Sequence, residues 1–181
     1  MVEGREYTFC FMYIELDESV EMERKYGRKT LSKALASFKR FIENAVRPFN
    51  GRIWMWTGMG GIILFPFDLR SSDALKCGFR IMLIKSLYDV EESVFPNFLS
   101  FRLALHIGNT VYRRGDTGNI ISDSLNYIFH LGQQFAEPGN FYITEEMLLI
   151  SHPAFVEYFY EQGEYEGRKI FRMRIPVHMG S

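Results

Sequence analysis

The 181-residue sequence has few cysteines, almost no net charge and no long apolar run. It contains two cysteines, Cys10 and Cys77, and each stands in an apolar run, where a free thiol usually behaves as a small buried hydrophobe. A reducing, cytoplasmic setting is therefore expected. The formal net charge is −1, so the sequence lacks the basic field that binding to nucleic acid would need. No apolar run approaches the roughly 20 residues of a membrane span, and direct membrane insertion is not expected.

The sequence does have ample material for one packed core. Hydrophobic residues make up 47% of it, including 17 Phe and 10 Tyr, whereas charged residues make up 24%. The length suits one domain, and neither a linker nor a low-complexity segment interrupts it. We therefore expect a single domain over residues 1–181 that folds without a metal, a disulfide or another cofactor.

Hydrophobic periodicity predicts strands and helices in a fixed order. Amphipathic spacing of apolar residues predicts helices at about 31–45, 72–90, 122–135 and from 144 onwards. Strands are expected at 7–16, 52–56, 62–65, 98–107 and 141–143, with an edge strand at 167–176. The order is βαββαβ followed by αβ. It predicts an α+β fold with a ferredoxin-like antiparallel core and C-terminal αβ additions.

The glycine-rich hairpin carries the first resemblance to a known family. Residues 51–65, GRIWMWTGMGGIILF, are similar to the class III adenylate/guanylate cyclase segment G-x-h-h-K-x-h-G-D-G-h-h-h-h-F, in which h is apolar. Three similar segments follow in family order: RLALHIG at 102–108, SLN at 124–126 with AEPG at 136–139, and YITEE at 142–146. The likeness covers about residues 9–149 and leaves 150–181 as an extension. It implies the fold of a nucleotide cyclase catalytic domain.

The resemblance also implies a pair of metal ions, held by two aspartates, that assist formation of a cyclic nucleotide. Here those positions hold Tyr13 and Met59. A neutral phenol and a thioether cannot replace two carboxylates as ligands of Mg²⁺. Glu15 shares a strand face with Tyr13 and is a candidate displaced ligand, although Glu15, Asp17 and Glu18 also suit a polar strand end or a helix cap. The register predicts that Tyr13 and Met59 lie near each other, and side chains on opposite sheet faces would contradict it.

The family's remaining catalytic positions are also altered. The positions that recognise the base hold Met55 and Asn119, which are more typical of a core and of a turn. Of the two residues that stabilise charge on the phosphate, Asn126 is retained, but the arginine position is His130. Histidine lacks the planar five-donor fork of arginine and is mostly neutral at pH 7. The spacing of four residues places Asn126 and His130 on one helix face.

These replacements favour a catalytically inactive, cyclase-like module that acts through regulatory or protein contacts in signal transduction. The alternatives are a divergent nucleotide cyclase, the silent half of a heterodimeric cyclase, and an unrelated ligand-binding domain of ferredoxin-like shape. A protein partner or self-association is expected, whereas a bound nucleotide has weaker support.

A surface for self-association is predicted on the strand at 52–56. Alternation would place Trp54 and Trp56 on the sheet face that the helices leave open, with Met55 towards the helices. Together with Arg52 they would form an aromatic patch of the kind enriched at interfaces. The competing interpretation is that the C-terminal residues at 158–160 and 170–171 cover this face.

Overall fold

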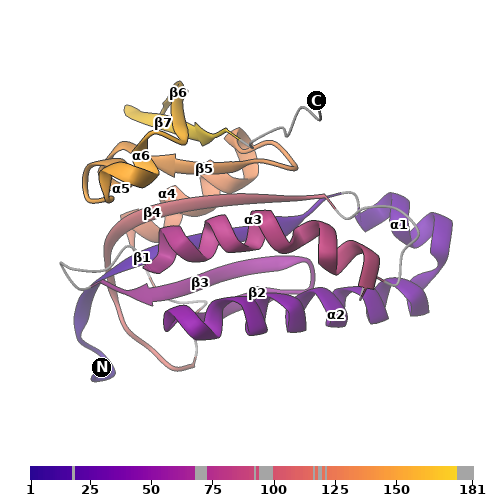
Figure 1. Cartoon of the computed structure of the whole chain (residues 1–181). Helices are drawn as coiled ribbons and strands as arrows, with labels where there is room; N and C mark the ends of the chain where they lie inside the picture. The colour runs from indigo at the N-terminus through magenta and orange to yellow at the C-terminus, as the bar shows by residue number, and fades with distance from the viewer. Residues whose placement is uncertain are drawn as a thin grey trace, which may run out of the picture.

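The computed structural model of the chain describes residues 1–17, 19–67, 73–91, 93, 100–115, 117, 120 and 122–174. They form a seven-stranded sheet with helices on both faces (Figure 1). The strands are β1 (Glu6–Leu16), β2 (Arg52–Thr57), β3 (Gly60–Pro66), β4 (Phe101–Val111), β5 (Phe141–Thr144), β6 (Phe159–Tyr165) and β7 (Arg168–Met173). The helices are α1 (Ser19–Tyr26), α2 (Arg28–Val46), η1 (Arg47–Phe49), α3 (Asp73–Glu91), α4 (Asp123–His130), η3 (Leu131–Phe135), α5 (Glu145–Leu149) and α6 (Pro153–Val156). None of the helices within the described part is long and apolar enough to cross a membrane.

The strand order, β2-β3-β1-β4-β5-β7-β6, confirms the predicted fold class. The strands β2, β3, β1 and β4 pair antiparallel throughout, as in a ferredoxin-like core. The additions depart from this pattern, because β5 pairs parallel with β4. The strand predicted at the sheet edge is β7, but it pairs with both β5 and β6, so the edge is formed by β6, which periodicity did not predict.

Strand β1 lies in the centre of the core and is buried on both faces. One face of the strand, with Cys10, Met12 and Ile14, packs with α2 and α3. The other face, with Phe9 and Tyr13, packs with α4 and η3. Burial on both faces explains why the strand reads as a continuous apolar run rather than an alternating one.

The two helix layers begin and end at identifiable residues. Helix α4 begins at an N-cap, Ser122, whose hydroxyl accepts from the Leu125 N–H at 3.3 Å and donates to the Asn109 carbonyl at 2.8 Å. The helix predicted over 122–135 is regular only to His130 and continues as the π-helical turn η3. On the other face, the rings of Phe41 and Tyr88 stack at 4.4 Å and join α2 to α3. Cys10 and Cys77 are buried and free, as expected.

Candidate functional site

Tyr13 fills the position that the cyclase resemblance assigns to the first metal ligand. Its side chain is 2% exposed, and its ring packs edge-on against Phe129 at 5.9 Å. The ring also lies against Gly132 of η3 so closely that a Cβ there would stand 2.2 Å from the Tyr13 Cδ1. The Tyr13 hydroxyl donates to Glu15 Oε2 at 2.6 Å. Burial, and then the neighbouring Glu15 carboxylate, raise the pKa of Tyr13 well above its ordinary value, so the phenol stays neutral.

The carboxylates near Tyr13 already have partners on the chain. Glu15 accepts a hydrogen bond from the Tyr13 hydroxyl, and Asp17 Oδ1 lies 2.9 Å from Arg102 Nη2. Arg102 also donates to the Gln133 carbonyl, at 3.4 Å. The third candidate, Glu18, lies outside the described residues. A cation shared by Glu15 and Asp17 would therefore have to displace a phenol from one carboxylate and a guanidinium from the other.

The predicted proximity of the Tyr13 and Met59 side chains is wrong. The two backbones come close, since the Leu16 N–H donates to the Met59 carbonyl at 3.0 Å. However, Met59 packs against the core on the α2 side, whereas Tyr13 belongs to the core on the α4 side. An uncharged thioether at the hairpin tip gains most by joining an apolar core. The pair therefore forms no joint site, and the opposite faces of the two side chains contradict the register predicted at this turn.

A β-bulge in β2 places the two tryptophans on opposite sheet faces, contrary to the prediction. The register against β3 shifts between Ile53 and Met55, which makes Trp54 the extra residue. Trp56 therefore faces α2, where its ring lies 6.1 Å from that of Phe38. Trp54 and Met55 pack on the α4 side, and the Trp54 indole donates to the Arg113 carbonyl at 2.7 Å. The predicted aromatic patch with both tryptophans on one face does not exist.

Of the positions predicted to read the base and stabilise the phosphate, only Met55 packs with the core that contains Tyr13 among the described residues. Met55 is half-buried on the same sheet face as Tyr13, and Asn119 lies outside the described residues. Asn126 and His130 are both exposed on α4, which fits their predicted common face. His130 Nδ1 lies 3.3 Å from Glu166 Oε1 at the turn between β6 and β7, so this histidine contacts the C-terminal hairpin.

The sheet face that carries Tyr13 also contains a partly buried polar cluster that the sequence patterns did not reveal. His106 of β4 is 2% exposed, and its Nδ1 lies 3.1 Å from Thr144 Oγ1. Its ring lies 4.9 Å from that of Tyr127, over which the Arg168 guanidinium stacks at 4.3 Å. Arg168 Nε donates to Glu146 Oε1 at 2.8 Å. Burial lowers the pKa of His106 to about 4, against the opposing effect of Glu146. The only signal in the sequence was one histidine within an apolar strand.

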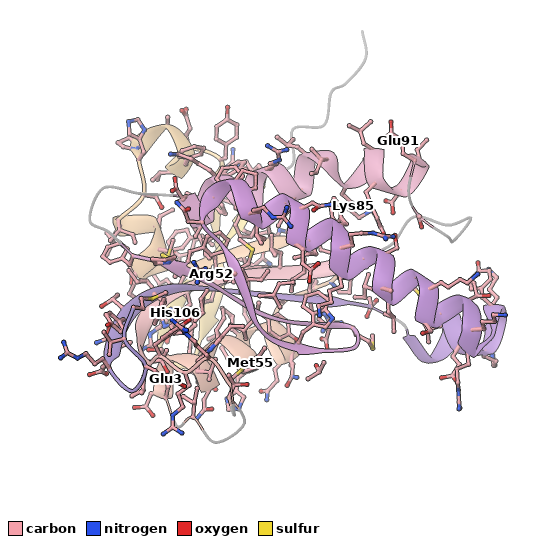
Figure 2. The ribbon with its side chains drawn as sticks, turned by 90° about the horizontal axis from the view of Figure 1, so that it is seen from below. Glu3, Arg52, Met55, Lys85, Glu91 and His106 are labelled. Atoms are coloured by element: carbon pink, nitrogen blue, oxygen red, sulfur yellow. The ribbon has the colours of Figure 1, made fainter. Side chains whose placement is uncertain are left out.

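Figure 2 relates these residues to the two layers. Met55 and His106 lie on the side of the sheet opposite α3, on which Lys85 and Glu91 are labelled. Within the described ranges, no group of three or more His, Cys, Asp or Glu side chains is placed to hold a metal ion. The arrangement around Tyr13 is an aromatic and hydrogen-bonded packing, in which the Tyr13 hydroxyl, Glu15 and Asp17 each have a partner in the chain.

Comparisons with known proteins identify the fold. No family model and no curated protein sequence matches the chain. Among solved structures, the guanylate cyclase domain of RhGC from Catenaria anguillulae in complex with GTP superposes with a TM-score of 0.79 at 10% identity, covering 94% of this chain and 98% of that one. An adenylate/guanylate cyclase/hydrolase from Silicibacter pomeroyi gives 0.74 at 16% identity, covering 93% and 97%. The adenylyl cyclase CyaB from P. aeruginosa gives 0.72 at 11% identity, covering 98% of both chains. The chain therefore has the fold of the class III adenylate/guanylate cyclase catalytic domains.

Proposed function

We propose that this domain is a catalytically inactive, cyclase-like module that acts through contacts with other proteins. The observation that carries the proposal is Tyr13: a neutral phenol, buried and hydrogen-bonded to Glu15, stands where the resemblance calls for a metal-binding carboxylate. The free, buried thiols of Cys10 and Cys77 suit work in the reducing cytoplasm. Regulation of a signalling partner is the role we infer for it.

The charge requirements of phosphoryl transfer support this proposal. Catalysis of that reaction depends almost entirely on charge placed around the phosphate by metal ions and basic side chains. Removal of one preorganised stabilising group costs about 10² to 10³ in rate, and groups that act together are not additive. Here the first metal position holds Tyr13 and the arginine position holds His130. Two such losses are enough to remove useful turnover.

A cyclase with relocated ligands is disfavoured by the contacts of the carboxylates. Asp17 pairs with Arg102, and the Asp17 side chain is 26% exposed and that of Arg102 17%. A metal at Asp17 would leave the Arg102 guanidinium in a largely buried place without its anion, which is costly. Glu15 would in turn leave the buried Tyr13 hydroxyl without an acceptor. Both costs oppose a metal site built from these two residues.

A direct assay for cyclic nucleotide tests the proposal. Purified protein is incubated with ATP or GTP and Mn²⁺, and the products are separated by chromatography beside those of an active cyclase domain. We expect no cyclic nucleotide above the protein-free blank. Product that increases with protein concentration and disappears in an Asn126→Ala variant would refute the proposal. The fold of that variant is checked by circular dichroism, and exposure of Asn126 on α4 makes it a mild substitution.

A further inference from the structure

An apolar groove of about 380 Å³ runs between α2 and the tip of the β2–β3 hairpin. Leu31, Leu35 and Ala36 of α2 form one wall, and Trp56 and Gly58 of the hairpin form the other. Figure 1 shows α2 lying alongside this hairpin. The groove is on the sheet face opposite Tyr13, because Trp56 and Leu35 pack against the core on the α2 side. The groove is thus separated from Tyr13, whereas Met59, next to Gly58 in the hairpin, packs on the same face as the groove.

The helix that forms the groove is strongly basic. Its cations are Arg28, Lys29, Lys33, Lys39 and Arg40, and its only acidic residue is Glu43, so α2 has a net charge of +4. The complete chain has a net charge of −1, so this positive charge is a local feature. Two of the cations, Arg28 and Lys39, line the groove directly. A ligand of negative charge and apolar contact surface complements both properties.

The ion pairs that these two cations make within the chain are weak competitors. Arg28 lies 3.0 Å from Glu23, with side chains 90% and 45% exposed. Lys39 lies 3.9 Å from Glu43, with side chains 43% and 45% exposed. Exposed ion pairs of this kind contribute little to stability. Both cations can therefore turn towards a bound anion at little cost.

We propose that this groove binds an acidic amphipathic α-helix of a partner protein. The proposal rests on the proposed function and names the chemistry of the protein that such a module would contact. A helix lays its apolar face into a groove of this kind and keeps its charged face at the rim. A membrane surface is the poorer fit, because the apolar side chains lie between a helix and a hairpin and do not form the exposed face of one amphipathic helix. Trp56 at the wall supplies the kind of aromatic anchor found in interface hot spots.

Trp56 also makes the groove directly observable. The chain has two tryptophans, and Trp54 lies on the opposite sheet face. A Trp54→Phe variant would therefore report only on the groove through the fluorescence of Trp56. Trp54 donates a hydrogen bond to Arg113, so that variant could lose stability. Isothermal titration calorimetry on the unaltered chain provides the same affinity without any substitution.

The probe is a synthetic peptide of roughly 18 residues with leucines at i, i+3, i+4 and i+7 and glutamates on the other face. A second peptide replaces every glutamate with lysine. We expect the acidic peptide to bind saturably and to change the fluorescence emission of Trp56. We expect no binding of the basic peptide. Ala36→Glu places a negative charge in the groove and should weaken binding at least about tenfold. The matched control is Asn44→Glu, an exposed position on the same helix that does not line the groove, which should change the affinity less than about twofold.

Equal binding of the two peptides, no binding of either, or an equal effect of the two glutamate variants would overturn the proposal. Vesicles of phosphatidylcholine with phosphatidylserine are titrated in parallel, and binding to them without binding to the acidic peptide would assign the surface to a membrane instead. The cyclase assay keeps the two proposals apart. No peptide binding together with no cyclic nucleotide would remove this groove and leave the inactive module in place. Formation of cyclic nucleotide together with binding of the acidic peptide would refute the inactive module and keep the groove as a binding site.

Discussion

Replacement of Gly132 by alanine tests how tightly the aromatic ring of Tyr13 is held in the position that the cyclase resemblance assigns to a metal ligand. A Cβ at Gly132 would lie 2.2, 2.4 and 2.6 Å from Tyr13 Cδ1, Cε1 and Cγ. All three distances are far below a van der Waals contact, and one of the atoms is the base of the ring rather than its mobile end. The ring cannot turn away freely, because its hydroxyl is held by Glu15 and its side packs on Phe129. Either Tyr13 or the η3 backbone must move.

Two opposing effects set the expected magnitude. Gly→Ala in a helical segment stabilises by up to about 1 kcal/mol through backbone entropy. Overpacking of a core costs about 1–3 kcal/mol. Because three ring atoms of Tyr13 are involved, we expect the clash to dominate and Gly132→Ala to destabilise the protein by about 1–2 kcal/mol. The sign alone distinguishes this expectation from the ordinary effect of alanine in a helix.

Urea denaturation of a double-mutant cycle provides the measurement. Tyr13→Val removes the ring, so Gly132→Ala in that background should be neutral or stabilising. The difference between the two backgrounds should exceed about 1 kcal/mol, with unchanged m-values. If Gly132→Ala stabilises the unaltered protein, or if the two changes are additive, the ring does not occupy this space and the main support for the inactive module is lost.

Other buried positions give equally specific expectations. Burial lowers the pKa of His106 to about 4, below its usual 6.5, so the unfolded chain takes up the proton first and stability falls as the pH drops from about 6.5 to about 4. His106→Gln should reduce that fall by roughly 3 kcal/mol in urea melts at pH 7, 5 and 4, and an unchanged fall would contradict it. Ser122→Ala removes the acceptor of the Leu125 N–H and should cost about 1 kcal/mol by the same method, whereas no loss would mean that the cap is not used. Gly60→Ala would place a Cβ 2.0 Å from the Ile14 carbonyl oxygen, and backbone atoms cannot move aside as a side chain can. We therefore expect the free energy of unfolding to fall by more than about 3 kcal/mol, or the variant not to fold, as measured by circular dichroism. A variant as stable as the unaltered protein would contradict the close approach.

Much of the central fold could be predicted from hydrophobic periodicity because its strands and helices obey their periods without interruption. The strand β1 is apolar from Phe9 to Ile14, and α2 has its buried residues on one face, so both were predicted correctly in type and order. The β6 strand was missed for the opposite reason. Its residues after Phe159 are largely polar and exposed, and a bulge opposite Ile170 interrupts its pairing with β7. Such a strand is held by its neighbour rather than by its own pattern.

The candidate site was harder to predict because single-residue shifts decide which face a side chain occupies. The bulge at Trp54 inserts one residue into β2 and exchanges the faces of Met55 and Trp56. Met59 at the hairpin tip took the direction of the nearer apolar core instead of that of Tyr13. Neither shift changes the local sequence pattern, so alternation alone gives the wrong face. The same bulge exposes the Trp56 ring to the groove beside α2.

The place of Tyr13 in β1 gives a physical reason why a cyclase fold tolerates a phenol at this position. Strand β1 is paired on both sides, and its residues from Phe9 to Ile14 are nearly inaccessible to solvent. An aspartate in the place of Tyr13 would put a carboxylate into this buried strand, and such a group is costly unless a cation or several donors compensate its charge. A neutral phenol that fills the space and donates to Glu15 removes this cost. Under the proposed function, the change that removes a metal-binding carboxylate would also favour burial of this strand, as expected where catalytic groups are kept at the expense of stability. The groove beside α2 lies on the other sheet face, so binding at the groove does not compete with the packing of Tyr13. A domain selected only for binding at the groove would therefore gain the packing of Tyr13 without loss of that binding.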